Sequence, residues 1–369
     1  MKQGWEIKKI KDICDKASSN IAQNKITELD GDYPVFGASG FVQNVDFYHR
    51  DTEYIGIVKD GSGVGRVNTY PAYSSLLGTL QYIIPKEGYL LNYVSYALKS
   101  LNLSEYASGA AIPHIYFKDY GEAVISVPPI EEQEKIVEEL DCLSGVIEKK
   151  REQLKELDAL AQSIFYTMFG DPITNEKGWE VDRLGNLCDI SSSKRIYAHE
   201  YCDNGIPFYR GKEISEKSKG NDISVELYIS EERYNELKNK FGVPQIGDIL
   251  LTAVGTIGNI WVVDSCTPFY FKDGNVLWLQ AKENINPIYF KTLLYNLIDK
   301  YKESMANGCA YSALTIVNLK EMKTNKVPYT LQQEFADKIA LIEKQKQLIK
   351  ESIAQTEELF NSRMAYYFN

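Results

Sequence analysis

The feature that most constrains the fold of this chain is an internal duplication of its sequence. Gly4-Trp5-Glu6-Ile7 recurs as Gly178-Trp179-Glu180-Val181, and Cys14 recurs as Cys188 at the same offset of 174 residues. Further matches follow in the same order: 33–36 with 206–209, 58–67 with 251–260, Tyr93, Leu98 and Leu101 with Tyr289, Leu294 and Leu297, Ser108-Gly109 with Asn307-Gly308, and Val127-Pro128 and Gln133-Glu134 with Val327-Pro328 and Gln333-Glu334. The offset changes by no more than a few residues between neighbouring matches, apart from one jump of about twenty residues, which indicates two copies of one unit with an insertion near residues 212–240.

Each copy begins with a mixed globular part. The runs 54–58 and 248–251 are apolar and strand-like, and each is followed by a turn that contains glycine. Apolar residues at helical spacing then predict one helix over 89–101 and another over 287–301. The second part of each copy, after a Val-Pro step, is predicted to be one long helix.

A heptad pattern runs through both long helices. Steps of four and three residues from Ile136 to Met168 meet an apolar side chain at nine of ten positions, and the same register from Phe335 to Tyr367 meets one at seven of ten. A helix of about 35–38 residues is about 50–57 Å long, and a seam along it must be buried against another helix. The seam residues expected to join the two helices are Ile136, Leu140, Leu143, Ile147, Leu154, Leu157, Ile164, Phe335, Ile339, Ile342, Ile349, Ile353 and Phe360.

The expected fold class is therefore α+β. Two similar mixed α/β domains, 1–126 and 171–326, are separated by a pair of long antiparallel coiled-coil helices, 127–170 and 327–369, in a pseudo-two-fold internal duplication. Antiparallel pairing is the simplest closed arrangement of two such helices. The alternative is that each helix is an amphipathic cover on its own globular domain.

Composition and charge restrict the functional classes. The net charge is -10, which by itself disfavours a nucleic-acid binder, but residues 127–169 carry half of the acidic excess, and 1–126 and 170–326 are nearly balanced. No apolar run approaches the roughly 18–20 residues of a membrane span, and the first residues do not read as a secretory signal. Six scattered cysteines without a Cys-x-x-Cys pair fit reduced thiols, and the wide sequence separation of the three histidines disfavours histidine-based metal binding. We therefore expect a cytoplasmic protein without a membrane partner or metal.

Candidate nucleic-acid contacts gather around the glycine turns of both copies. They are Lys59, Ser62, Gly63 and Arg66 in the first copy, and Lys194, Arg195, Tyr209, Arg210, Lys212, Lys217, Lys219 and Thr256 in the second. Lys and Arg can contact phosphates or guanine edges, and backbone N–H groups of glycine turns can approach a phosphate closely. The alternative is that they are tight turns and a solvated charged surface over an aromatic core.

Signatures of catalysis are absent from the sequence. Gly211-Lys212 is followed by Glu213 rather than the Ser or Thr of a phosphate loop, and Gly61-Ser62-Gly63-Val64-Gly65 lacks the spacing of a dinucleotide loop. There is no Asn/Asp-Pro-Pro-aromatic motif of amino-methyltransferases and no Gly-x-Ser-x-Gly elbow. We therefore expect a binding module with no catalytic residue.

At this point the sequence resembles the specificity subunits of type I restriction–modification systems. The resemblance rests on the repeated Gly-Trp-Glu, on Tyr33-Pro34-Val35-Phe36-Gly37-Ala38-Ser39-Gly40, on the two glycine turns, on Gly247-Asp248-Ile249-Leu250-Leu251, and on Val127-Pro128-Pro129-Ile130-Glu131-Glu132-Gln133 before the heptad helix. It covers essentially the whole chain, twice. The second Val-Pro departs from it, because Tyr329-Thr330-Leu331-Gln332 follows.

This resemblance implies a DNA-binding protein of a restriction system. Each target-recognition domain would read one half of a bipartite, asymmetric site in double-stranded DNA, and the helices would set the spacer and dock two methyltransferase (M) subunits. Restriction (R) subunits would join that core. The chain itself would hold no cofactor, because S-adenosylmethionine, ATP and Mg would bind only to the partner subunits.

Two other functional classes remain open at this point. One is a coiled-coil adaptor that makes no DNA contact. The other is a self-contained methyltransferase or nuclease with a cryptic centre.

Overall fold

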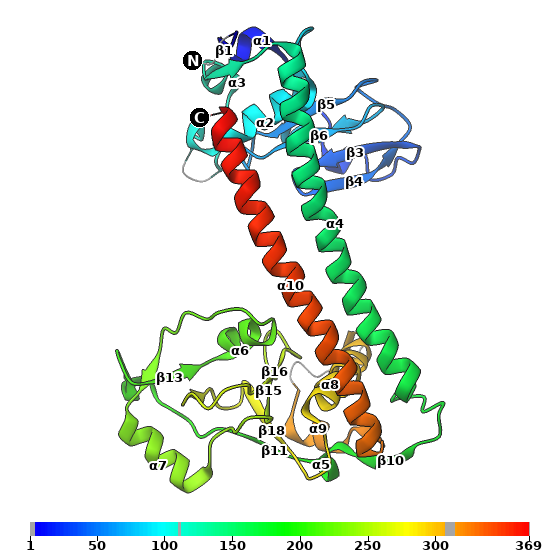
Figure 1. Ribbon diagram of the computed structural model, residues 1–369, viewed down its shortest axis with the longest axis vertical. Helices are drawn as coiled ribbons and strands as arrows, with labels where there is room; N and C mark the ends of the chain where they lie inside the picture. The colour runs from blue at the N-terminus through cyan, green and yellow to red at the C-terminus, as the bar shows by residue number, and fades with distance from the viewer. Residues whose placement is uncertain (1–3, 110–111, 307–313, 369) are drawn as a thin grey trace. The chain divides into compact units, whose positions relative to one another are not determined.

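The computed structural model describes residues 4–109, 112–306 and 314–368, the side chains of 304–306 excepted. The match Asn307-Gly308 and Cys309 lie outside the described residues. The chain forms two compact units: unit 1 comprises Met1–Gln153 with Ile349–Asn369, and unit 2 comprises Leu154–Leu348 (Figure 1). Each unit thus contains one globular part and a portion of both long helices, so its boundaries differ from the four segments expected from the sequence.

The globular part of unit 1 is built on three small sheets. Its elements are β1 (Glu6–Lys9), α1 (Ile10–Ile13), β2 (Cys14–Ser18), η1 (Gln23–Lys25), β3 (Tyr33–Gly37), β4 (Gly40–Val45), β5 (Tyr54–Val58), β6 (Val67–Tyr70), β7 (Ser75–Leu76), β8 (Leu80–Pro85), α2 (Leu91–Ser100), η2 (Leu103–Tyr106), α3 (Phe117–Tyr120) and β9 (Val124–Val127). The strand orders are β1-β9, β2-β8-β5-β6 and β4-β3-β7. Helix α2 buries Val94, Ala97 and Leu98 in one cluster with Ile55 and Ile83 of the four-stranded sheet, as expected for an amphipathic helix on a sheet.

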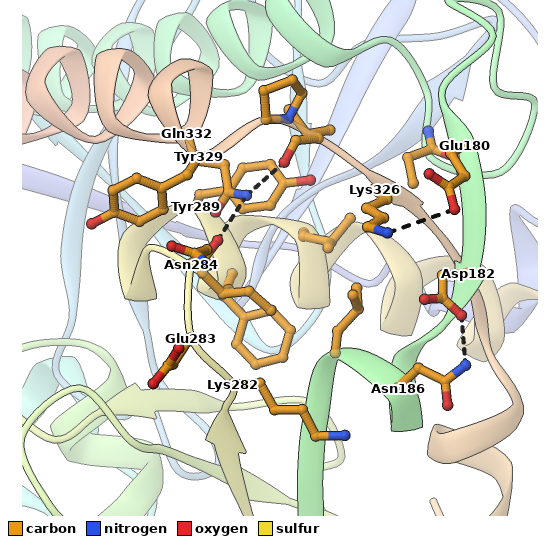
Figure 2. A pocket seen from close by; sticks show the side chains of 17 residues that line it. Glu180, Asp182, Asn186, Lys282, Glu283, Asn284, Tyr289, Lys326, Tyr329 and Gln332 are labelled. Carbon is orange, nitrogen blue, oxygen red and sulfur yellow. Dashed lines mark hydrogen bonds and ion pairs between the residues drawn. The ribbon is translucent and has the colours of Figure 1, made fainter.

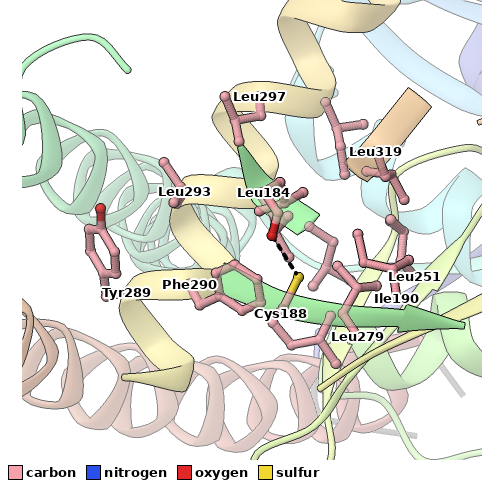
Figure 3. Close-up of a cluster of buried hydrophobic side chains, with 14 of the residues drawn as sticks. Leu184, Cys188, Ile190, Leu251, Leu279, Tyr289, Phe290, Leu293, Leu297 and Leu319 are labelled. Carbon is pink, nitrogen blue, oxygen red and sulfur yellow. Dashed lines mark hydrogen bonds between the residues drawn. The ribbon is translucent and has the colours of Figure 1, made fainter. Parts of the chain in front are cut away.

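Unit 2 repeats this architecture with additions. Its globular elements are β10 (Glu180–Arg183), α5 (Leu184–Leu187), β11 (Cys188–Ser192), η3 (Ala198–Glu200), β12 (Tyr201–Cys202), β13 (Ile206–Tyr209), α6 (Gly211–Ser218), β14 (Tyr228–Ile229), α7 (Glu231–Phe241), β15 (Ile249–Thr252), β16 (Ile260–Val262), β17 (Tyr270–Phe271), β18 (Val276–Ala281), α8 (Pro287–Ala306), α9 (Ile316–Glu321) and β19 (Lys323–Lys326). The strand orders are β10-β19, β11-β18-β15-β16 and β12-β14-β13-β17. Figure 3 shows the core, in which Phe290 and Leu293 of α8 pack with Cys188 and Leu279 of the sheet.

The shared topology confirms the duplication. The four-stranded sheets β2-β8-β5-β6 and β11-β18-β15-β16 have equivalent strands in the same order, and a parallel pair recurs in each unit, β3 with β7 and β13 with β17. The insertion is also found where the offset jumps. Helices α6 and α7 with strand β14 occupy the segment between β13 and β15, where the first copy has only the strand β4 between β3 and β5.

The structure corrects two details of the repeat alignment. Gln133 donates to the Pro128 carbonyl (3.0 Å) and accepts from the Leu90 N–H (3.0 Å), while Gln332 donates to Val327 (2.8 Å) and accepts from Asn286 (2.9 Å). Gln332, not Gln333, is therefore the counterpart of Gln133. The pairing of β5 with β8 and β6, and of β15 with β18 and β16, also makes Val58 equivalent to Thr252 and Val67 equivalent to Ile260. The first glycine turn is therefore one residue longer than the second.

The two long helices, α4 (Ile130–Phe169) and α10 (Tyr329–Phe368), are 40 residues each, or about 60 Å. In unit 1, Glu139 contacts Arg363 (2.5 Å), and further along α4 Arg151 contacts Glu357 (2.6 Å). In unit 2, Asp158 contacts Lys346 (2.7 Å) and the Phe165 ring lies 5.7 Å from that of Phe335. Rising numbers on α4 meet falling numbers on α10, so the helices are antiparallel within each unit, as the sequence predicts.

The seam residues are buried to different degrees. Buried members are Ile136, Leu140, Ile147, Phe335, Ile339 and Ile342, and half-buried members are Leu143, Leu154, Leu157, Ile164, Ile349, Ile353 and Phe360. Near the start of α4, Ile136 also packs on Trp5 and Tyr93, so there the helix covers its own domain as well as meeting α10. Polar groups interrupt the seam at Lys150, whose ammonium group donates to Ser352 (2.5 Å).

The last turns of α4 depart from the heptad frame. Phe165 and Phe169 are buried there with Tyr289 and Phe335, whereas the heptad positions Ile164 and Met168 are half-buried. A straight α-helix drifts by about 20° per heptad relative to a 3.5-residue repeat. Over four heptads that drift moves the apolar face to the neighbouring positions, so the end of α4 packs into the core of the second copy.

Candidate nucleic-acid interface

One edge of each four-stranded sheet gathers the loops that carry the predicted contacts. In unit 1 the antiparallel pairs Ser18↔Gln81, Val58↔Leu80 and Ile57↔Val67 place the ends of β2 and β5 beside the starts of β6 and β8. We call this edge the loop edge of unit 1; it carries residues 19–23, 59–66 and 77–79. Lys59, Ser62, Gly63 and Arg66 therefore lie together, next to a loop after β2 that the sequence did not single out.

The glycine turn of unit 1 is held by backbone hydrogen bonds. Gly65 N–H donates to Val58 (2.8 Å), Lys59 N–H to Thr79 (3.0 Å) and Gly61 N–H to Pro113 (3.0 Å). Gly65 has φ +87°, and a Cβ there would lie 2.5 Å from the Ser104 nitrogen, so glycine is required. Ser62 and Arg66 are exposed on this fixed turn, which leaves their side chains available to a ligand.

A second segment, residues 112–116, joins the loop edge of unit 1. Ile115 N–H donates to the Lys59 carbonyl (3.0 Å), and His114 contacts the Asp60 carboxylate. The Tyr116 ring lies 4.1 Å from the His114 ring, with the Lys118 ammonium 5.2 Å from Tyr116. Sequence reasoning missed this cluster, because Asp60 and His114 are 54 residues apart and no motif joins them.

The equivalent edge of unit 2 carries the predicted contacts of the second copy. The pairs Ser192↔Leu277, Thr252↔Val276 and Leu251↔Ile260 bring the ends of β11 and β15 to the starts of β16 and β18. We call it the loop edge of unit 2; it carries residues 193–195, 253–259 and 272–275, and Lys272 N–H donates to the Tyr209 carbonyl (2.9 Å) at the end of β13. Lys194, Arg195, Arg210, Lys212 and Thr256 lie at or beside this edge, and Lys217 and Lys219 follow on and just after α6.

Two of these cations, Arg210 and Lys212, share the Glu226 carboxylate. Arg210 pairs with Glu213 (2.8 Å) and with Glu226 (2.8 Å), and Lys212 pairs with Glu226 (2.7 Å). Hydrogen bonds from Lys212 and Arg210 lower the pKa of Glu226 to about 2. Burial raises the pKa of Glu213, but hydrogen bonds from Arg210 outweigh it, and the net pKa is lowered. Both carboxylates are therefore ionised at neutral pH, and a phosphate must compete with Glu226 for the two cations.

The remaining cations of unit 2 have mixed surroundings. Arg195 pairs with Asp273 (2.9 Å), and this hydrogen bond raises the pKa of Arg195. Lys219 pairs with Glu216 (2.8 Å). The Lys194 ammonium lies 4.6 Å from the centre of the Phe241 ring, and the Lys217 ammonium lies 5.7 Å from the Trp261 ring. Neither forms a salt bridge within the part of the chain that the structure describes. Lys194 and Lys217 are thus the more available cations.

Tyr209 requires a correction. Its ring is only 7% exposed and stacks on Phe269 with centroids 4.9 Å apart, and burial raises the pKa of its hydroxyl. Tyr209 therefore belongs to the aromatic core rather than to a DNA-contacting surface. Thr256, by contrast, is exposed, and its carbonyl accepts from the Thr252 hydroxyl (2.5 Å), which fixes the second glycine turn.

The opposite edge of the unit 2 sheet holds a cavity of about 560 Å³. Figure 2 shows Glu180, Lys282, Tyr289 and Lys326 around it, with Lys326 3.6 Å from Glu180. It lies where β11 begins and β18 ends, so it is separate from the loop edge.

Among the described residues, no group of three or more His, Cys, Asp or Glu side chains is arranged to hold a metal ion. No helix in the described part of the chain is long and apolar enough to cross a membrane.

Comparison with known proteins decides the family. The model of the type I restriction modification DNA specificity domain matches residues 2–159 and again 176–358. The chain belongs to this family. A putative type I restriction enzyme specificity subunit from Haemophilus influenzae is 24% identical over 92% of this chain and 87% of its own length. The MjaIX specificity subunit from Methanocaldococcus jannaschii is 28% identical over 64% of this chain and 63% of its own length.

Solved structures show the same fold. A type I restriction–modification S subunit from M. genitalium aligns with a TM-score of 0.60 at 17% identity, over 99% of this chain and 96% of the other. A chain from a structure of the assembly and conformational transition of a type I system aligns with a TM-score of 0.57 at 16% identity, over 98% and 97%. The duplicated family model and this fold make the chain a specificity subunit with two DNA specificity domains, one in each unit.

Proposed function

We propose that this specificity subunit reads a bipartite, asymmetric site in double-stranded DNA, with the loop edge of each unit binding one half-site. The observation that carries the proposal is the pair of equivalent sheet edges with different side chains. Unit 1 presents Ser62 and Arg66 on its glycine turn, and unit 2 presents Thr256 there and a further cation, Lys217, on the inserted helix α6. Equal scaffolds with unequal contacts suit two different half-sites, because base contacts rather than the scaffold carry sequence information.

The long helices then set the spacer and dock two methyltransferase subunits, and restriction subunits join that core. We assign no catalytic residue and no cofactor to this chain: S-adenosylmethionine, ATP and Mg act on the partner subunits. The assignment is supported by the absence of the catalytic motifs in the sequence and by the relatives' names, which describe specificity subunits. One structural neighbour comes from a study of assembly of a type I system, which supports the proposal that this chain works in a complex.

A domain exchange tests the proposal. The full chain is produced with its methyltransferase subunit in a host without other modification systems, and modified bases are mapped. Replacing residues 171–326 by the corresponding segment of a related subunit should change one half-site and keep the other half-site and the spacer. A change in both half-sites would contradict independent reading. Base modification by the purified chain alone with S-adenosylmethionine would favour a self-contained enzyme, and unchanged DNA mobility with the methyltransferase present would favour an adaptor.

A further inference from the structure

The loop edge of unit 1 contains a groove that no charged side chain lines. Its volume is about 760 Å³, and it lies between the loop after β2, the turn from β3 to β4 and the segment before β8. Its polar side chains are Asn20, Gln23, Ser39 and Thr79, and its exposed aromatic ring is Phe41, which is 62% exposed. We call it the amide groove.

The amide groove adjoins the cations of the same edge. Thr79, at its margin, accepts a hydrogen bond from the Lys59 N–H (3.0 Å), so the groove and the glycine turn with Arg66 are neighbours. Lys and Arg suit phosphates and guanine edges, whereas uncharged Asn and Gln amides and apolar groups suit the edges of adenine and thymine. The loop edge of unit 1 therefore separates the two kinds of contact in space.

The amides of the groove are free to bind a ligand. Asn20, Gln23 and Ser39 are exposed, and the structure gives their side chains no hydrogen-bond partner among the residues that it describes. Gln43, by contrast, is used internally, because its amide donates to the Leu29 carbonyl (3.1 Å). The difference indicates that Asn20 and Gln23 do not serve to hold the fold.

The backbone beneath these amides is rigid. Ile21 and Ile26 are buried on either side of Gln23, and Gly78 N–H donates to the Ile21 carbonyl (2.8 Å). Leu77 N–H donates to Phe36 (2.8 Å), which fixes the β3–β4 turn to the same segment. Side chains that contact bases need little reordering on binding when the backbone that carries them is already fixed.

The corresponding place in unit 2 is different. Where β11 ends, as β2 does in unit 1, there is a cavity of only about 150 Å³, lined by Lys194 and by Phe241 and Gly242 at the end of the inserted helix α7. The insertion thus occupies the corresponding space. The two edges offer different chemistry: an uncharged groove beside Lys59 and Arg66 in unit 1, and in unit 2 a small cavity lined by Lys194, near cations that are paired with carboxylates.

We propose that the amide groove reads base edges of the half-site bound by unit 1, with Asn20 and Gln23 as the specificity-determining side chains and adenine as the base that they fit. An Asn or Gln amide can pair with N6 and N7 of adenine at once. Phe41 fits an apolar contact such as the thymine methyl group. This inference rests on the proposed function, since it names the residues that carry out the reading.

The test uses the full chain in complex with its methyltransferase subunit. The recognised site is mapped first, and binding is then measured against duplexes that differ from it at single positions. The double variant Asn20→Ala/Gln23→Ala should lose discrimination about 5- to 150-fold at adenine-containing positions of one half-site only. Asn44→Ala, an exposed amide of β4 outside the groove, is the matched control and should keep full discrimination.

Salt dependence separates base reading from phosphate contact. Because the double variant removes no charge, its slope of log affinity against log salt should equal that of the parent complex. Lys59→Ala/Arg66→Ala should instead reduce that slope by up to about 2 while the preferred bases stay the same.

Three outcomes decide the inference. Unchanged discrimination in the Asn20/Gln23 double variant overturns it, and so does equal weakening for all sequences, which would make these residues phosphate or structural contacts. A parent complex that modifies no defined sequence overturns the proposed function itself, and the inference with it. As a control, the double variant should unfold at the same temperature as the parent protein, which would show that a loss of discrimination does not come from unfolding.

Discussion

The glutamine at the start of each long helix gives the sharpest prediction about stability. Gln133 is 1% exposed and makes three hydrogen bonds: it accepts from Leu90 N–H (3.0 Å) and donates to Pro128 (3.0 Å) and Gly88 (3.3 Å). Gln133→Met keeps the length of the side chain and removes the amide, so one backbone N–H and two carbonyls lose their partner.

The expected loss follows from the burial of these groups. A buried polar group without a partner costs about 1–3 kcal/mol. The bond to Pro128 is buried, whereas the other two are partly buried, so water can replace part of their contribution. We therefore expect a loss of about 2–4 kcal/mol in the free energy of unfolding of unit 1.

The measurement is denaturant unfolding of the full chain, followed by a probe in unit 1. Trp5 is a suitable probe of unit 1, because it packs in the same cluster as Ile136 and its indole N–H donates to Glu132 (3.0 Å). Gln153→Met, at an exposed position of the same helix, is the matched control and should change stability by less than about 0.5 kcal/mol. A loss below about 0.5 kcal/mol for Gln133→Met would refute the assigned role of the hydrogen bonds.

Three further predictions test the rest of the account. Deleting one facing heptad from each long helix should shorten both helices by about 10 Å, which corresponds to about three base pairs of DNA. Base mapping should then show a shorter spacer with both half-sites kept, and altered half-sites would contradict the proposal that the helices set the spacer. Glu226→Gln should release Lys212 from its ion pair and remove one of the two ion pairs of Arg210. Binding to unrelated DNA should then tighten several-fold, and the slope of log affinity against log salt should steepen by about 1. An unchanged slope would show that no phosphate reaches these two cations. Cys142 and Cys266 should react with thiol reagents at pH 8, whereas burial raises the pKa of Cys14 and of Cys188 to about 12 and should protect both; fast labelling of all four would contradict the fold.

The pH dependence of the Glu226 pair has a defined sign. Lys212 and Arg210 lower the pKa of Glu226 from 4.5 to about 2. The folded state therefore favours the charged carboxylate more strongly than the unfolded state does. The stability that the pair contributes is present above about pH 4.5 and is lost as the pH falls toward about 2. Near neutral pH the two cations are therefore still covered, and only a competing anion or a substitution uncovers them.

The sequence predicts the duplication and the antiparallel helices because both depend on repeated local patterns. Gly-Trp-Glu and the heptads recur at regular spacing, and the same side chains bury the same faces. The sequence could not place Tyr209, because an aromatic residue at the end of a strand, next to Arg210, fits a core or a surface equally well. Nor could it reveal that Glu226 covers Arg210, since the two are 16 residues apart and only the fold of the inserted segment brings them together.

The amide groove was missed for a different physical reason. Basic residues are visible in a sequence because their charge is exceptional, whereas Asn20 and Gln23 are common polar residues that appear at many surfaces. They become notable only when the fold leaves them exposed and unpaired on a rigid loop beside Lys59. Reasoning from charge therefore finds phosphate contacts more readily than base contacts.

The acidic character of the chain agrees with a separation of phosphate contacts from base contacts. Non-specific DNA affinity rises with the number of phosphates that Lys and Arg neutralise, and it competes with specific binding at every other site in a genome. In unit 2, Glu213, Glu226 and Asp273 hold cations that would otherwise attract any phosphate, and in unit 1 the amide groove is uncharged. Both arrangements keep the sequence-independent attraction low, so that correct base contacts supply a larger share of the binding free energy. A specificity subunit with a net charge of -10 is thus physically consistent with a role in which discrimination matters more than affinity, and in which the partner subunits supply the remaining phosphate contacts.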